Sequence, residues 1–165
     1  MDFVYQNGGI LPPYKTVGWM KSTNIYLTPT DTTIGFVSQS ADRLTTIKHR
    51  PPHKHYIKAL PTLKQLRTFT RIPEKHKNRV RRSHRTSFVF PNGHSYRVIR
   101  DTPHTQLLKK IAWVYTTSAN LSGEEYDERF AQSMADVIVG FPKIDKLTKA
   151  SKIYKLGINN IQKIR

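Results

Sequence analysis

Short apolar runs along the chain predict a series of short β-strands. Each run holds five or six residues and is bounded by turn-forming residues, which is typical of buried strands. The predicted strands are 24–28 (NIYLT), 55–60 (HYIKAL), 136–141 (DVIVGF), 152–156 (KIYKL) and 161–165 (IQKIR). Residues 86–100 (TSFVFPNGHSYRVIR) predict a β-hairpin, because Asn92 and Gly93 supply turn residues that tolerate positive φ between two β-rich runs.

Apolar residues three and four positions apart predict helices between these strands. In the first helix Leu44 and Ile47 share one face, Ser40 or Asp42 is the cap, and Pro51 ends it. In the second helix, residues 61–69, we expect Pro61 at the first helical position. Pro73 is expected to begin a third helix. Two more helices are expected over 102–113, with Thr102 as cap, and 127–135.

The alternation of strands and helices predicts an α/β fold with an open, twisted, mixed parallel and antiparallel sheet and flanking helices. The length of the chain, 165 residues, fits one domain. We expect a single domain over residues 22–165. Residues 1–21 contain the Gly- and Pro-rich segment NGGILPPYK and are expected to form an N-terminal arm or lead.

The charge of the chain points to a polyanionic partner. Lys and Arg number 28 and Asp and Glu number 11, which gives a net charge of +17. Such a field attracts nucleic acid or nucleotides. The most basic stretch, Arg71–Arg85, has few apolar residues, and it is either a solvated helix face or a patch that faces phosphates. No apolar run is long enough to span a bilayer and no signal peptide is evident, so we expect no membrane partner and a cytoplasmic location.

Several classes of chemistry have no support in the sequence. The chain has no cysteine, and four of its seven histidines lie among Lys and Arg, where repulsion disfavours a metal ion; we expect no protein metal site. Walker, GxGxxG and GxSxG motifs are absent. The remaining hydroxyls, amides and cations suit electrostatic handling of phosphate.

Three segments carry these groups at a spacing that is specific as a set. They are PTDTTIG (residues 29–35), KHRP (48–51) and TSANLSG (117–123). The set resembles the YrdC-like family of threonylcarbamoyl-AMP synthases, whose motifs have the same order. Weaker similarity continues through ASKIYKL and IQKIR, so that the resemblance covers about residues 22–165. It implies the YrdC/RibB-like form of the predicted fold, with a concave basic face.

The resemblance also implies an activity. Members of this family join L-threonine, bicarbonate and ATP into threonylcarbamoyl-AMP with release of pyrophosphate. A tRNA threonylcarbamoyl transferase complex then modifies tRNA, and some relatives bind tRNA or double-stranded RNA. Mg²⁺ is expected to be held mainly by the ATP phosphates.

Residue roles follow from the matching motif positions. The resemblance implies catalytic roles for Lys48 and Arg50, which are two apart and could point into one cleft. It implies L-threonine contacts for Thr30 and Thr32. The residues implied to contact ATP are Ser118, Asn120, Ser151 and Arg165. Asp31 is interpreted as a turn-stabilising residue in preference to an outer partner of Mg²⁺.

The sequence departs from the family pattern at several points. SHRTSFVF replaces the usual proline-glycine-proline before the hairpin, with Ser87 where a threonine is expected, and SKIYK replaces serine-threonine-valine-valine. Two alternatives therefore stand beside the synthase. One is a catalytically degenerate member that binds double-stranded RNA or tRNA, and the other is a basic domain without a ligand.

Overall fold

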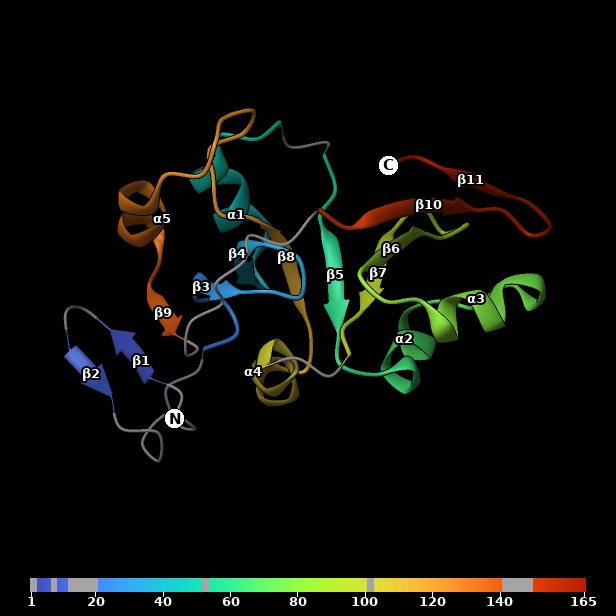
Figure 1. Ribbon diagram of the computed structural model, residues 1–165, viewed down its shortest axis with the longest axis horizontal. Coiled ribbons are helices and arrows are strands. Elements are labelled where there is room, and N and C mark those ends of the chain that lie inside the picture. The colour runs from blue at the N-terminus through green and yellow to red at the C-terminus, as the bar shows by residue number, and fades with distance from the viewer. Residues whose placement is uncertain (1–2, 7–8, 12–20, 52–53, 101–102, 141–149) are drawn as a thin grey trace.

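The described residues form one long mixed sheet with helices on both faces. The computed structural model describes residues 3–6, 9–11, 21–51, 54–100, 103–140 and 150–165. Within them the eleven strands follow the order β11-β10-β6-β7-β5-β8-β4-β3-β9-β1-β2. The strands are β1 (Phe3–Gln6), β2 (Gly9–Leu11), β3 (Tyr26–Pro29), β4 (Ile34–Ser38), β5 (Ile57–Leu60), β6 (Thr86–Val89), β7 (Ser95–Val98), β8 (Val114–Ser118), β9 (Val137–Gly140), β10 (Lys152–Leu156) and β11 (Ile161–Lys163). The predicted fold class, an open mixed α/β sheet, is confirmed (Figure 1).

The helices lie in the regions where the sequence predicted them, and the third follows Pro73 as a 3₁₀ turn and a short α-helix. They are α1 (Ala41–Lys48), α2 (Leu63–Phe69), the 3₁₀ turn η1 (Glu74–His76), α3 (Lys77–Arg82), α4 (Pro103–Ile111) and α5 (Glu128–Met134). Ser40 caps α1 by accepting a bond from the Arg43 amide, as expected. Pro61 was wrongly expected to be the first helical residue of α2; Thr62 is the cap, and its hydroxyl accepts from the Gln65 amide. The predicted cap Thr102 lies outside the described residues.

Two further details differ from the sequence-based prediction. The turn between β6 and β7 uses positive φ only at Gly93, at 81°, and Asn92 does not adopt it. The Phe90 amide donates to the His94 carbonyl, so three residues form the loop. A three-residue loop with glycine in its last position is the next most common hairpin turn. Strands β1 and β2 lie in the segment expected to be an arm or lead, and β1 pairs with β9.

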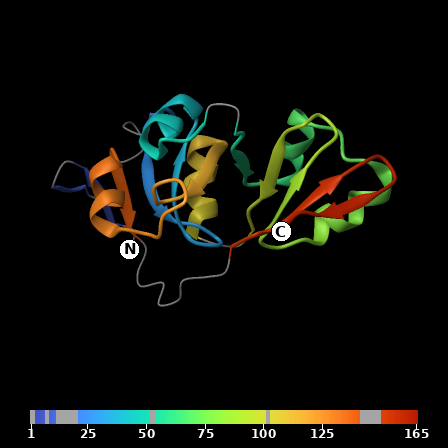
Figure 2. The same ribbon diagram turned by 90° about the horizontal axis from the view of Figure 1, so that it is seen from above.

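Strand alternation divides the core between the two faces of the sheet. Ala59, Val114 and Val37 pack with Leu107, Leu108 and Ile111 of α4, so this side is called the α4 face. Their strand neighbours point to the other side, called the opposite face. There Leu60, Phe88 and Tyr96 pack with Leu66 of α2 and Val80 of α3. Farther along that face, Phe36 and Leu27 pack with Leu44 of α1 and Ala131 of α5. Figure 2 shows α1 and α2 over separate parts of the sheet.

Candidate functional site

A cavity of about 460 Å³ opens on the α4 face of the sheet. Its walls come from the β3–β4 turn, the segment after α1, strands β5, β7 and β8, and the two C-terminal strands. This volume lies in the range of small-molecule sites. The lining residues are Thr30, Thr32, Thr33, Arg50, His55, Tyr56, Ile57, Val89, Ser95, Arg97, Thr116, Thr117, Ser118, Ala150, Ser151, Ile153, Ile164 and Arg165.

The first motif forms a tight turn at the floor of this cavity. The Thr30 hydroxyl accepts from the amides of Thr32 and Thr33 at 3.2 Å each and donates to the Thr33 carbonyl at 2.6 Å. Gly35 follows in β4, and a Cβ there would lie 2.7 Å from the Thr117 carbonyl oxygen. Only glycine therefore lets β4 approach β8 this closely, and this approach brings the threonines beside Ser118.

A buried ion pair fixes this turn to the sheet. Asp31 lies 3.4 Å from the Arg97 guanidinium, and the two side chains are 5% and 4% exposed. Arg97 also donates to the Thr32 hydroxyl at 3.3 Å, and its Nε has no partner. Burial raises the pKa of Asp31 although the charge of Arg97 offsets part of that effect. Asp31 thus holds the turn through Arg97 of β7, an arginine that the motif comparison did not single out.

The two cations at and just after the end of α1, Lys48 and Arg50, point to different places. His49 adopts left-handed φ of 46°, which reverses the chain after the helix. Arg50 then lines the cavity, lies 4.6 Å from the Tyr56 ring centroid and donates to the His55 carbonyl at 3.1 Å. Lys48 is buried and is not among the lining residues. Burial, reinforced by the charge of Arg50, lowers the pKa of Lys48 to about 8.

Lys48 instead holds the loop that follows β8. Its ammonium donates to the Ser118 carbonyl at 2.7 Å and to the carbonyl of Asn120, and it also contacts Asn120 Oδ1 at 3.3 Å. The Asn120 amide nitrogen donates within the loop to the carbonyls of Leu121, at 2.9 Å, and Glu124. Ser118 is exposed and lines the cavity, whereas Asn120 does not line it. In this arrangement Lys48 and Asn120 position the loop that presents Ser118.

The two C-terminal strands supply the remaining wall. Strand β10 pairs in parallel with β6 and places Ser151 beside Ser87, with 3.3 Å between the hydroxyl oxygens. Arg165 donates to the Ser151 carbonyl at 3.1 Å and to its hydroxyl at 3.3 Å. Ser151 is buried and Arg165 is exposed at the rim. The guanidinium of Arg165 and the hydroxyl of Ser151 thereby line the cavity, and Ser87 lies behind Ser151.

The fold gathers most of the predicted site residues in this one cavity. Six line it, namely Thr30, Thr32, Arg50, Ser118, Ser151 and Arg165. Lys48, at the end of α1, and Asn120, in the loop that Lys48 holds, do not line the cavity, and all eight roles stay predictions. Sequence reasoning missed Arg97, whose signal would have been a lone arginine in the apolar run SYRVI. Among the residues that the structure describes, no three His, Asp or Glu side chains form a group that could hold a metal ion.

No family model matches the chain. A curated relative from Mycoplasma pneumoniae, an uncharacterised protein, is 32% identical over 93 residues, which are 56% of this chain and 20% of that protein. A doubly substituted Sua5 of P. abyssi matches with a TM-score of 0.74 and 17% identity over 90% of this chain and 51% of that one. A second P. abyssi Sua5 structure, complexed with L-threonine, has a TM-score of 0.69, 19% identity and 85% and 49% coverage.

E. coli YciO matches with a TM-score of 0.68 and 16% identity over 92% of this chain and 86% of that one. The chain therefore has the fold of Sua5 and YciO, the YrdC-like fold, and it spans about half the length of the Sua5 structures. Separately, no helix in the described part of the chain is long and apolar enough to cross a membrane.

Proposed function

We propose that the chain is an L-threonylcarbamoyladenylate synthase, which forms threonylcarbamoyl-AMP and pyrophosphate from L-threonine, bicarbonate and ATP. The observation that carries the proposal is the single cavity in which three separate motifs meet. Hydroxyls and guanidinium groups surround it, and these groups suit phosphate and amino-acid ligands. The fold shared with Sua5, of which one structure holds L-threonine, supports the same activity.

Arg50 and Arg165 are the proposed phosphate ligands. Both line the cavity, and both use only part of their donors in the protein: Arg50 donates one bond to His55, and Arg165 donates two to Ser151. A guanidinium carries five N–H donors, so donors remain for phosphate oxygens. Ser118 and Ser151 would add hydroxyl donors. Lys48 and Asn120 would act by holding Ser118 in place.

The proposed amino-acid end of the cavity is the threonine turn. Thr32 presents its hydroxyl beside Arg97, and a carboxylate placed there would receive bonds from both. The unpartnered Nε of Arg97 is a donor that such a ligand could satisfy. Thr30 shapes the turn, because its own hydroxyl is engaged with Thr33.

The chemistry requires position and charge more than proton transfer. Bicarbonate yields CO₂ and hydroxide, the amine of L-threonine adds to CO₂ to give a carbamate, and the proton that the amine loses leaves with the hydroxide as water. A carbamate oxygen then bonds to the α-phosphorus of ATP. The bond between that phosphorus and the bridging oxygen breaks, and pyrophosphate leaves with the electron pair. Cations that hold both anions in one cavity align the attack and stabilise the leaving group. Mg²⁺ bound to the ATP phosphates would neutralise further charge.

Threonine-dependent pyrophosphate release tests this function. Purified protein with ATP, Mg²⁺, bicarbonate and L-threonine should release pyrophosphate, and omission of threonine should abolish the signal. Arg50→Ala should lower the rate by about 10²-fold or more, since it removes a cation at the transferred phosphate. Arg67→Ala, which changes an exposed arginine of α2 on the opposite face, is the matched control. Equal rates in Arg50→Ala and wild type would refute the proposal.

The product would pass to a tRNA threonylcarbamoyl transferase complex, because a mixed carbamic-phosphoric anhydride is an activated group donor. This partner is part of the same proposal. It predicts that purified transferase components consume the product and modify tRNA only when the chain is present with its three substrates.

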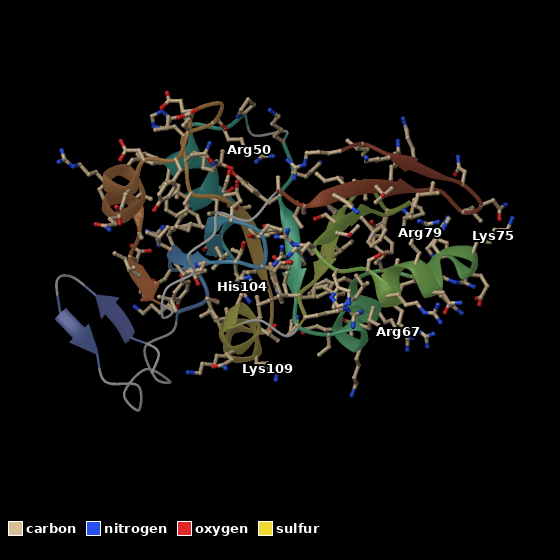
Figure 3. All side chains as sticks on the ribbon, in the orientation of Figure 1. Arg50, Arg67, Lys75, Arg79, His104 and Lys109 are labelled. Atoms are coloured by element: carbon tan, nitrogen blue, oxygen red, sulfur yellow. The ribbon has the colours of Figure 1, made fainter. Side chains whose placement is uncertain are left out.

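A second candidate function is binding of double-stranded RNA or tRNA without synthesis. The observation that favours it is a cationic surface on η1 and α3, where Lys75, Lys77, Arg79, Arg81 and Arg82 are all exposed. Figure 3 shows Lys75 and Arg79 at the end of the molecule away from Arg50. Among the described residues Glu74 is the acidic group that pairs there, with Lys77. Duplex RNA affinity that falls steeply with salt, without pyrophosphate release, would favour this function.

A further inference from the structure

A second cavity, of about 400 Å³, lies on the opposite face of the sheet. Its walls include Tyr56, Lys58, Phe69, His94, Tyr96 and Tyr115. It therefore lies between the part of the sheet covered by α1 and α5 and the part covered by α2 and α3. None of the motifs discussed above contributes a residue to it.

Strand register shows that the two cavities lie back to back. Lys58 of β5 is paired with Tyr115 of β8 on one side and with Tyr96 of β7 on the other. Ile57, one position earlier, is paired with Thr116 and Ser95 and lines the first cavity, on the α4 face. Because successive side chains alternate between faces, Lys58 and its two tyrosine neighbours point away from that cavity. Tyr56 and Ser95 line both cavities, at the rim.

Lys58 holds its ammonium against aromatic rings without a counter-ion. The Lys58 Nζ lies 4.1 Å from the ring centroids of both Phe69 and Trp113, and 5.4 Å from that of Tyr115. No carboxylate in the described residues forms an ion pair with it. Lys58 is half-buried, so water solvates its charge less than at an open surface, and this burial lowers its pKa. An anion that reached this cation would gain more than it would at a fully hydrated lysine.

The remaining walls suit a planar ring. Tyr115 supplies a partly exposed aromatic side chain beside Lys58, and Tyr96, on the other side of Lys58, is buried. His94 and Asn92 from the hairpin loop lie exposed at the margin. Asn92 donates to the Tyr96 hydroxyl at 3.2 Å, which ties the loop to the cavity. Aromatic walls, one unpaired cation and a marginal amide are the components that proteins use to hold an unpaired base and its phosphate.

We propose that this cavity binds one nucleotide unit of single-stranded RNA, with the base against Tyr115 and the adjoining phosphate at Lys58. The net charge of +17 and the exposed cations of α2, the helix that supplies Phe69 to the cavity wall, attract the strand. Duplex RNA does not fit this role, because its bases are stacked inside the helix. The proposal does not depend on the synthase activity, since Lys58 lies on the other face of the sheet.

Binding of a fluorescent eight-nucleotide single-stranded RNA, followed by anisotropy, tests the proposal. Lys58→Gln and Tyr115→Leu should each weaken binding about tenfold, the effect of losing one stacked and charge-paired unit. Lys64→Gln removes an equal charge from an exposed position of α2 and should change the affinity less than about threefold. Tyr115→Leu should leave the slope of affinity against salt unchanged, because it removes no charge.

Two results would overturn the proposal. Equal losses in Lys58→Gln and Lys64→Gln would show that only the general charge matters. Competition by inorganic polyphosphate in Lys58→Gln and wild type alike, with no effect of Tyr115→Leu, would show that no base is held. Should Tyr115→Leu fail to fold, the comparison of the two lysine variants decides alone. Pyrophosphate release should be unaltered in Lys58→Gln, so failure here and failure of the synthase proposal remain distinguishable.

Discussion

The buried pair of Asp31 and Arg97 gives a prediction whose size follows from the structure. Arg97→Met removes the guanidinium and leaves the buried Asp31 side chain, 5% exposed, without its cation. Loss of one partner of a buried pair costs about 3–5 kcal/mol, because the other charge stays desolvated. Domains have total stabilities of about 5–15 kcal/mol, so this variant should lose a large share of the total.

The loss should depend on pH in a defined direction. Burial already raises the pKa of Asp31, and removal of Arg97 raises it further. When the pKa of a carboxyl group is higher in the folded than in the unfolded protein, the ionised group destabilises the fold. This loss is complete above the folded pKa and absent below the unfolded pKa of about 3.9. Arg97→Met should therefore be destabilised more at pH 7.5 than at pH 5. The double variant Asp31→Asn/Arg97→Met has no carboxyl group at position 31, so the contribution of Asp31 to the pH dependence of stability should disappear.

Urea unfolding followed by circular dichroism at both pH values measures these quantities. The wild type, two single variants and the double variant form a cycle in which the pair should show a coupling of at least about 1 kcal/mol. The double variant should be more stable than Arg97→Met at pH 7.5. Additive losses, or a loss below about 0.5 kcal/mol in Arg97→Met, would refute the claim that this pair anchors the turn.

Three further variants test other parts of the site and core. Lys48→Met should lower the free energy of unfolding by about 1–3 kcal/mol, because the carbonyls of Ser118 and Asn120 lose their charged donor; a thermal melt measures it. His104 is 1% exposed with both ring nitrogens unpartnered, and burial lowers its pKa to about 3. Acidification from pH 6.5 to 5 should therefore destabilise the wild type by about 2 kcal/mol through this residue, and urea titrations of His104→Leu should lack that contribution. Gly35→Ala should cost about 1–3 kcal/mol, because its Cβ would lie 2.7 Å from the Thr117 carbonyl oxygen; an unchanged melting temperature would contradict this reason.

The elements that carried strong local signals were predictable from the sequence. Ser40 before a periodic apolar run located α1, and two β-rich runs around PNG located the β6–β7 hairpin. Pro61 misled the boundary of α2 because proline and the threonine after it are both common at helix starts, and the Thr62 hydroxyl makes the capping bond.

The site was predictable as a set of motifs but not as a geometry. The motifs predicted that Arg50 and Ser118 lie close together, and both line the cavity. They gave no sign that Lys48 faces the carbonyls of the loop after β8. That outcome depends on the left-handed φ of His49, a residue whose side chain gives no such signal. The contacts of Arg97 and Lys58 join residues far apart in the sequence. Arg97 donates to Thr32, 65 positions away, and strand register pairs Lys58 with Tyr115, 57 positions away. No local pattern at Arg97 or Lys58 predicts these partners.

Titration calorimetry of the two ligands tests the central claim most directly, which is that one cavity holds a nucleotide and L-threonine together. L-threonine should bind the protein with a 1:1 stoichiometry in the presence of a non-hydrolysable ATP analogue and Mg²⁺. Arg50→Ala should weaken the binding of the analogue, and Thr32→Val should weaken that of the amino acid. Absence of heat for both ligands, or binding that is equal in wild type and both variants, would contradict the account.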